Sequence, residues 1–98
     1  MAGPLLERRL KMLSRRLAQL REDLSLADEQ LAHFAEESDD ARIRALVSET
    51  PLSDHEHREA ERSTFAMSRH RDDLVEKIAR VEAEQDALLD KLSTRRRS

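Results

Sequence analysis

The chain has no cysteine, no tryptophan and no tyrosine, and only one glycine and two prolines among its 98 residues. Without cysteine, neither disulfide bonds nor thiolate metal sites can form. A single glycine excludes the glycine-rich loops that cradle phosphate groups, and no Ser, His and acid set is framed by glycines. We therefore expect a protein that is not an enzyme, with no metal site and no cofactor of its own.

Long apolar runs are also absent. No apolar run approaches the roughly 20 residues that a membrane-spanning helix needs, and the opening MAGPLLERRL lacks the apolar core of a signal peptide. The sequence therefore predicts a cytoplasmic location and no membrane partner.

The composition is 38% apolar and 40% charged, a balance found both in disordered chains and in long helices. The spacing of the apolar residues decides between the two. From residue 6 onward they advance by alternating steps of four and three: Leu6, Leu10, Leu13, Leu17, Leu20, Leu24, Ala27, Leu31 and Phe34. Such a seam over about four heptads is typical of a coiled-coil helix.

The same register then reaches Ser38, Ala41 and Ala45, which are small or polar. The larger apolar residues move to three other positions, Ile43, Leu46 and Val47. This change predicts that the apolar stripe shifts around the helix near residues 36–40, with local unwinding and weaker packing.

A break follows at residues 49–53, where Pro51 removes a backbone donor and disfavours a helical conformation at Thr50. Ser53 and Glu56 match a capping box, which predicts that a second helix begins at Asp54. Its seam again alternates steps of four and three: Ala60, Thr64, Met67, Arg71, Leu74, Ile78, Val81, Gln85, Leu88 and Leu92.

These patterns predict an all-α fold, in which two long helices form an antiparallel coiled-coil hairpin within one domain over residues 1–98. The first helix covers about 4–49, the turn 50–53, the second helix about 54–93, and a basic tail 94–98. The fold places Leu31 opposite Arg71, and the polar seam residues Arg71 and Gln85 are expected to fix the register. Because a seam of two helices is thin, a monomer and a homodimer both remain open.

Charge is distributed unevenly. Residues 22–61 carry three basic and thirteen acidic side chains, whereas residues 1–21 carry six basic and one acidic. At the turn, Glu49, Asp54 and Glu56 either present carboxylates to a Mg²⁺ ion held by a partner or only favour a helix N-terminus.

The opposite end of the hairpin is expected to be basic, through Arg8, Arg9, Lys11, Arg15, Arg16, Arg95, Arg96 and Arg97. Such a group is either a solvated end or a surface for a polyanion or an acidic protein. Because aromatic side chains for base stacking are lacking, direct nucleic-acid binding is not expected.

Residues 52–62, LSDHEHREAER, resemble the tip of the Gre transcript-cleavage factors. Five residues fall in step with that family's pattern: Leu52, Ser53, Asp54, Ala60 and Arg62. The phrase LREDL at 20–24 is similar to the family's first helix, and the resemblance covers the coiled-coil region only. Gre-type and DksA-type proteins insert such a hairpin into the secondary channel of RNA polymerase, where tip acids act near the catalytic Mg²⁺.

The resemblance implies a regulator that binds RNA polymerase or a sigma factor. Asp54 falls at the second acid of the family, while the first acid falls on Pro51, with Glu49 or Glu56 as the available substitutes. A structural coiled-coil adaptor with an unspecified protein partner is the alternative from another class.

A second resemblance involves Arg15, Gln19 and Asp23. They repeat part of the nucleotide-binding motif of an actinobacterial anti-sigma hairpin controlled by cyclic di-GMP. The preceding Glu and Ser of that motif fall on Arg8 and Met12. This resemblance implies a further alternative, an anti-sigma-like hairpin that responds to the nucleotide.

Overall fold

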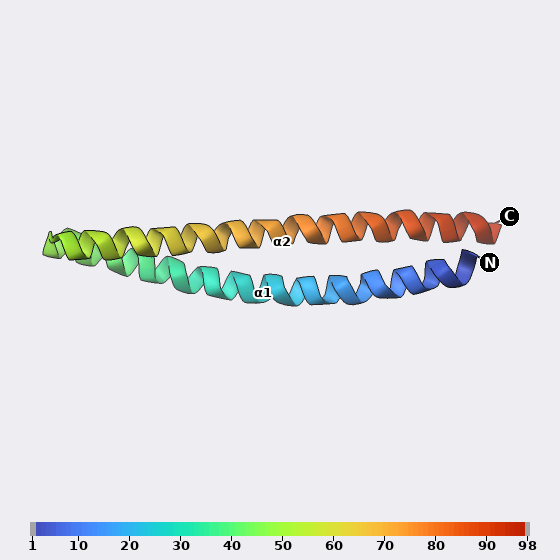
Figure 1. Ribbon diagram of the computed structural model, residues 1–98, viewed down its shortest axis with the longest axis horizontal. Coiled ribbons are helices and arrows are strands. Elements are labelled where there is room, and N and C mark those ends of the chain that lie inside the picture. Colours follow the sequence, from blue (N-terminus) through green and yellow to red (C-terminus); the bar gives the residue numbers. More distant parts are fainter. Residues whose placement is uncertain (1, 98) are drawn as a thin grey trace. The chain divides into compact units, whose positions relative to one another are not determined.

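A computed structural model describes residues 2–97 of the chain, and the side chains of residues 3–96. Helix α1 spans Ala2–Ser48 and helix α2 spans Pro51–Arg97, with Glu49 and Thr50 between them (Figure 1). No strand occurs in the described part of the chain. The predicted all-α hairpin of two long helices is thereby confirmed.

All four helix ends differ from the prediction, and α1 already begins at Ala2 rather than near residue 4. Helix α1 ends at Ser48, one residue earlier than expected, and α2 begins at Pro51, three residues earlier than expected. Residues 94–97, predicted as a tail, continue α2, and Ser98 lies outside the described residues. The early start of α2 follows from its cap, because proline suits the first helical position, where its missing N–H has no helical partner to lose.

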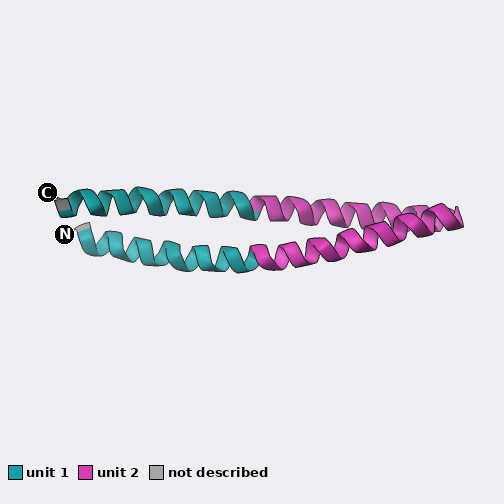
Figure 2. Cartoon of the chain, turned by 180° about the vertical axis from the view of Figure 1, so that it is seen from behind, with its two compact units in different colours: residues 1–23, 74–98 teal, residues 24–73 magenta. Residues whose placement is uncertain are grey.

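Packing between the helices falls into two compact units (Figure 2). Unit 1 comprises residues 1–23 and 74–98, and unit 2 comprises residues 24–73 and so includes the turn. In each unit a stretch of α1 lies alongside a stretch of α2 that runs in the opposite direction.

Unit 1 is held by a seam of large apolar side chains. Its buried residues are Leu13, Leu17 and Leu20 on α1, and Leu74 and Val81 on α2. All five were predicted from the steps of four and three, which keep one face of each helix turned toward the other. At the edges of this seam, Arg9 pairs with Glu84, and Arg21 lies 3.8 Å from Glu82.

The seam of unit 2 is made of small residues, and the predicted shift of the stripe is wrong. Ala41 is only 2% exposed and Ala45 is also buried, so the original register continues toward the turn. Ile43, Leu46 and Val47, expected to take over the seam, are exposed, and Val47 reaches 81%. Helix α1 is unbroken through residues 36–40.

Close approach of the helices explains why small residues occupy this seam. The Thr64 hydroxyl on α2 lies 3.1 Å from the Phe34 carbonyl oxygen on α1 and 2.9 Å from the Ala60 carbonyl oxygen of its own helix. A side chain this short reaches the backbone of the neighbouring helix only where the two backbones lie close together. Alanine permits that distance, whereas isoleucine or leucine at the same position would hold the helices apart.

Within the described residues, neither helix contains a stretch that is both long and apolar enough to cross a membrane.

Candidate functional site

The turn in unit 2 is closed at the end of α1 by Glu49. Its backbone has a φ of 48°, and its N–H donates to the Ala45 carbonyl oxygen at 3.0 Å. This left-handed residue after the last helical residue is a common helix stop, usually taken by glycine because a side chain is disfavoured there. The backbone turn therefore sets the direction of the Glu49 side chain.

The start of α2 is capped by Thr50 together with Ser53. The Ser53 N–H donates to the Thr50 hydroxyl oxygen at 3.2 Å, and the Thr50 N–H donates to the Ser53 hydroxyl oxygen at 3.2 Å. The first helical bond joins the Asp54 N–H to the Thr50 carbonyl oxygen at 3.1 Å. This is a capping box in which Ser53 takes the third helical position. The predicted box of Ser53 with Glu56 is wrong, since it began three residues too late.

The true cap leaves the acids of the turn with no capping role. The side chains of Glu49, Asp54 and Glu56 are exposed, and none forms a hydrogen bond or ion pair with the rest of the described chain. Two large apolar residues beside them, Leu46 and Leu52, are also exposed, at 66% and 67%. We call these five residues the turn surface; it combines carboxylates with apolar side chains.

An open hollow lies between α1 and α2 in unit 2, and Glu56 of the turn surface is one of its lining residues. It is lined by Glu37, Asp40, Ala41, Arg44, Glu56 and Ala60. Its three carboxylates add to the negative potential of this unit, and Arg44 is its one basic group. Across residues 2–97 no three His, Asp or Glu side chains gather closely enough to hold a metal ion.

Four of the predicted basic residues form one exposed face of α1 in unit 1. Arg8, Lys11, Arg15 and Arg16 make no ion pair with other described residues. Arg9 differs from them because it is paired with Glu84.

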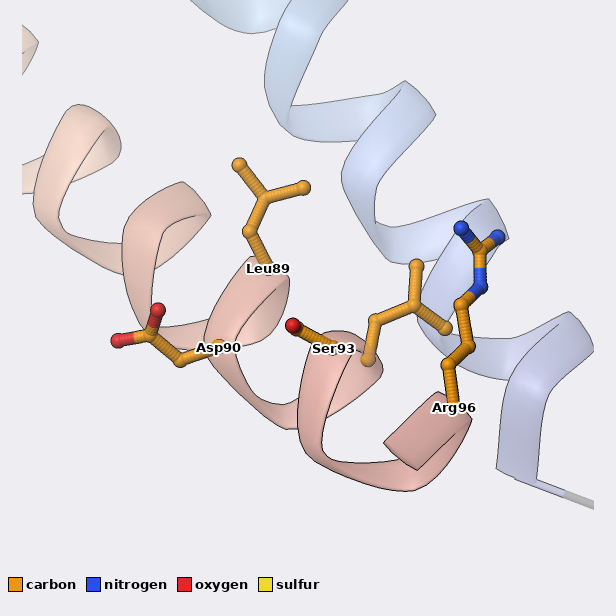
Figure 3. Close-up of a pocket in the computed structure, with 5 residues that line it drawn as sticks. Leu89, Asp90, Ser93 and Arg96 are labelled. Carbon is orange, nitrogen blue, oxygen red and sulfur yellow. The ribbon is translucent and has the colours of Figure 1, made fainter. Parts of the chain in front are cut away.

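The basic residues of α2 follow a different pattern. Arg95 is exposed and engaged in an interaction within the chain, and the side chain of Arg97 lies outside the described residues. Arg96 lines a shallow hollow with Leu89, Asp90, Leu92 and Ser93, in which Leu89 and Arg96 reach toward α1 (Figure 3). All its lining residues belong to one helix, so a small molecule there would be enclosed from one side only.

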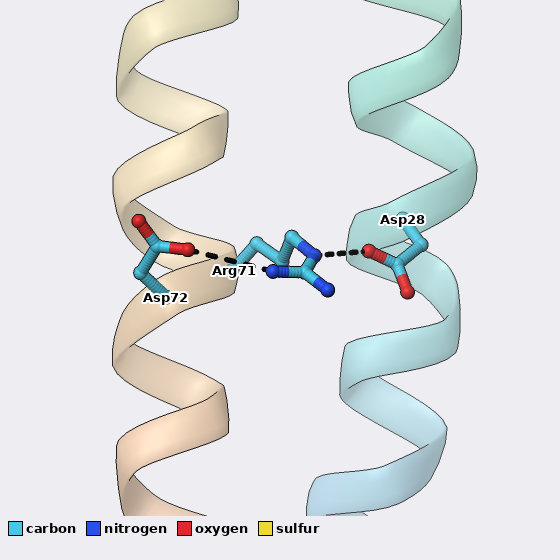
Figure 4. A network of polar contacts seen from close by, with 3 residues as sticks. All are labelled: Asp28, Arg71 and Asp72. Carbon is cyan, nitrogen blue, oxygen red and sulfur yellow. Dashed lines mark hydrogen bonds and ion pairs between the residues drawn. The ribbon is translucent and has the colours of Figure 1, made fainter.

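Both polar seam residues of α2 make contacts across the seam. In unit 2, Arg71 donates from Nε to an Asp28 carboxylate oxygen at 2.6 Å and contacts Asp72 at 3.5 Å (Figure 4). The hydrogen bond and charge of Asp28 raise the pKa of the Arg71 guanidinium, so it stays protonated. On α1 the hydrogen-bond partner of Arg71 is Asp28, three residues before Leu31, the residue predicted to lie opposite Arg71. In unit 1, the Gln85 side-chain amide donates to the Ser14 hydroxyl at 3.1 Å.

The three residues that resemble a nucleotide-binding motif lie within unit 1. The Gln19 side-chain amide donates to an Asp23 carboxylate oxygen at 3.0 Å, and Arg15 lies one turn earlier on α1. Arg8 and Met12 stand where that motif has Glu and Ser, so a cation and a thioether replace two acceptors.

No known protein family matches this chain, and the searches of curated proteins and of solved structures find no similar protein.

Proposed function

We propose that this chain is a non-enzymatic, cytoplasmic regulator that binds RNA polymerase or an associated transcription factor through the turn surface. One observation supports the proposal more than any other. Thr50 and Ser53 cap α2, so the exposed carboxylates of Glu49, Asp54 and Glu56 form no hydrogen bond or ion pair in the described chain, and the first-turn position of Asp54 adds only a favourable charge at the helix start.

The chemistry of the turn surface suits a protein partner. Leu46 and Leu52 offer apolar anchors, because exposed leucines gain most when a partner removes them from water. The neighbouring carboxylates can orient toward a cation, including a Mg²⁺ ion held by the partner. Because Pro51 occupies the position of the first acid in the Gre-type pattern, we propose modulation of the polymerase rather than RNA cleavage.

The alternative is a structural adaptor, in which the helices serve only to bring proteins together. The seams of the two helices and the thin core favour an adaptor as much as they favour a regulator. The two functions differ in what the acids do, since an adaptor needs no carboxylates at its turn.

A paired substitution distinguishes the two functions. Asp54→Asn with Glu56→Gln removes two charges and keeps nearly the same volume. We expect the double variant to bind RNA polymerase core enzyme with little change and to lose its effect on transcription. Binding is measured by surface plasmon resonance with the purified core enzyme, and the effect by RNA synthesis in vitro.

Two further variants serve as controls. Glu29→Gln with Asp73→Asn removes two exposed charges elsewhere in unit 2 and should change neither readout. Leu46→Ser with Leu52→Ser should weaken binding itself. If the wild-type chain neither binds the polymerase nor alters transcription, the regulator is excluded and the adaptor remains.

A further inference from the structure

The basic face of unit 1 consists of Leu5, Arg8, Lys11, Met12 and Arg15 on α1. The last four are spaced at i, i+3, i+4 and i+7, so they share one side of the helix. All five are exposed, and the three cations have no ion pair in the described chain. No acid occurs between residues 8 and 21, so this face is purely cationic.

The acidic face of unit 2 repeats this spacing with the opposite charge. It consists of Glu36, Asp39, Asp40, Ile43 and Val47, again one side of α1. All five are exposed, and none of its three carboxylates forms an ion pair in the described chain. Unit 2 as a whole has thirteen acidic and six basic residues, whereas unit 1 has twelve basic and eight acidic.

We infer that the basic face of one copy binds the acidic face of a second copy of this chain. The order of residues along the two faces favours an antiparallel contact. Going along α1, the basic face begins with the apolar Leu5 and continues with three cations interrupted by Met12, whereas the acidic face begins with carboxylates and ends with apolar residues. Opposed helices therefore bring Leu5 to Val47, Lys11 to Asp40, and Arg15 to Glu36.

Of the five facing pairs, Lys11–Asp40 and Arg15–Glu36 join opposite charges and Leu5–Val47 joins apolar side chains, while Arg8 faces Ile43 and Met12 faces Asp39. Opposite charges meet, which steers the encounter and fixes the register, while two exposed apolar ends leave water together. Leu26 lies midway between the two faces in the sequence and is also exposed.

A second copy fits the basic face better than a nucleic acid does. A nucleic acid could set phosphates against the three exposed cations, but this face carries no aromatic side chain for base stacking and offers apolar Leu5 and Met12 instead. A second copy presents a carboxylate face of matching length with apolar residues at its end. The contact uses none of the five residues of the turn surface, although Asp40 of the acidic face lines the same hollow as Glu56.

Reversal of charge on each face provides the test. One variant carries Lys11→Glu with Arg15→Glu, and a second carries Glu36→Lys with Asp40→Lys. Each replaces exposed residues without a recorded ion pair, so circular dichroism should show the wild-type helix content. Sedimentation velocity should show the wild type as a dimer of 11.4 kDa chains, and each variant alone should associate about tenfold more weakly or worse.

The decisive measurement is an equal mixture of the two variants. Each then offers the face that the other lacks, and we expect dimers to return, weakened by added NaCl. Lys77→Glu with Arg80→Glu makes the same change of charge at exposed positions outside both faces and should leave association intact. Turn variants such as Asp54→Asn with Glu56→Gln should also dimerise normally.

Three results would overturn the inference. The first is a wild-type chain that remains monomeric at low salt and high concentration. The second is a mixture of the two charge-reversed variants that remains monomeric. The third is a monomeric wild type that binds a 20-base-pair DNA duplex through Lys11 and Arg15, which would assign the basic face to nucleic acid.

Discussion

At the residue scale, the hydroxyl groups of Thr50 and Ser53 determine which side chains of the turn are left without a hydrogen bond. Thr50 and Ser53 satisfy each other's backbone N–H groups, so the start of α2 needs no carboxylate. Thr50 was missed because the motif of Ser53 followed by Glu56 is the more familiar capping pattern. The position of Pro51 was the available signal, since proline favours the first helical position and so marks the preceding residue as the cap.

The cap predicts a specific difference in stability. Thr50→Ala should lower the free energy of unfolding by about 0.5–2 kcal/mol, because it leaves the Ser53 N–H without its partner. Glu56→Gln should change it by less than about 0.5 kcal/mol, because that side chain makes no capping bond and only adds charge near the helix start. Urea unfolding followed by circular dichroism measures both. A larger loss for Glu56→Gln than for Thr50→Ala would move the cap back to Ser53.

At the scale of elements, the fold was predictable wherever the seam was built from large apolar residues. The steps of four and three located both helices and every buried residue of unit 1, because large apolar residues at this regular spacing indicate one buried face of a helix. In unit 2 the predicted seam residue Ala27 is also buried, but the prediction failed at residues 41–47, where size was taken as a sign of burial. Ala41 and Ala45 form the seam because the helices lie close there, and that distance depends on both helices together.

The candidate site was also predicted only in part. The residues of the turn and the basic stretch were identified from charge alone, because solvated charges can be counted in the sequence. The sequence did not show which of these side chains lack an ion pair. Arg9, for example, pairs with Glu84 on the other helix of unit 1, whereas the neighbouring Arg8 forms no ion pair in the described chain. Pairing depends on side-chain reach between helices, which spacing along one helix does not specify.

Two substitutions test the register of unit 2. Ala41→Asp places a charge in a buried seam and should lower the free energy of unfolding by several kcal/mol, on the order of 3 or more. Ile43→Asp lies two residues away on an exposed face and should cost less than about 1 kcal/mol. Thermal melting followed by circular dichroism compares them. The opposite order would show that the stripe does shift at residues 36–40.

At the scale of the whole molecule, neither the thin core nor the exposed ion pairs contribute much to the stability of the fold. No large side chain of the described residues is fully buried, and the three buried α1 residues other than the leucines of unit 1 are all alanines: Ala27, Ala41 and Ala45. Exposed ion pairs such as Arg21 with Glu82 add little, because salt and side-chain entropy offset them. A chain of this kind gains stability from any partner that binds only the folded form.

If a second copy is such a partner, thermal stability must depend on protein concentration. The dimer forms only from folded chains, so mass action raises Tm as the concentration rises, by several degrees over a hundredfold range for a domain of this size. The Lys11→Glu with Arg15→Glu variant associates more weakly, so its Tm should rise less than that of the wild type over the same range of concentration. Differential scanning calorimetry measures both chains at low salt. A wild-type Tm that is independent of concentration would show that the folded chain gains no stability from a second copy and would contradict the dimer.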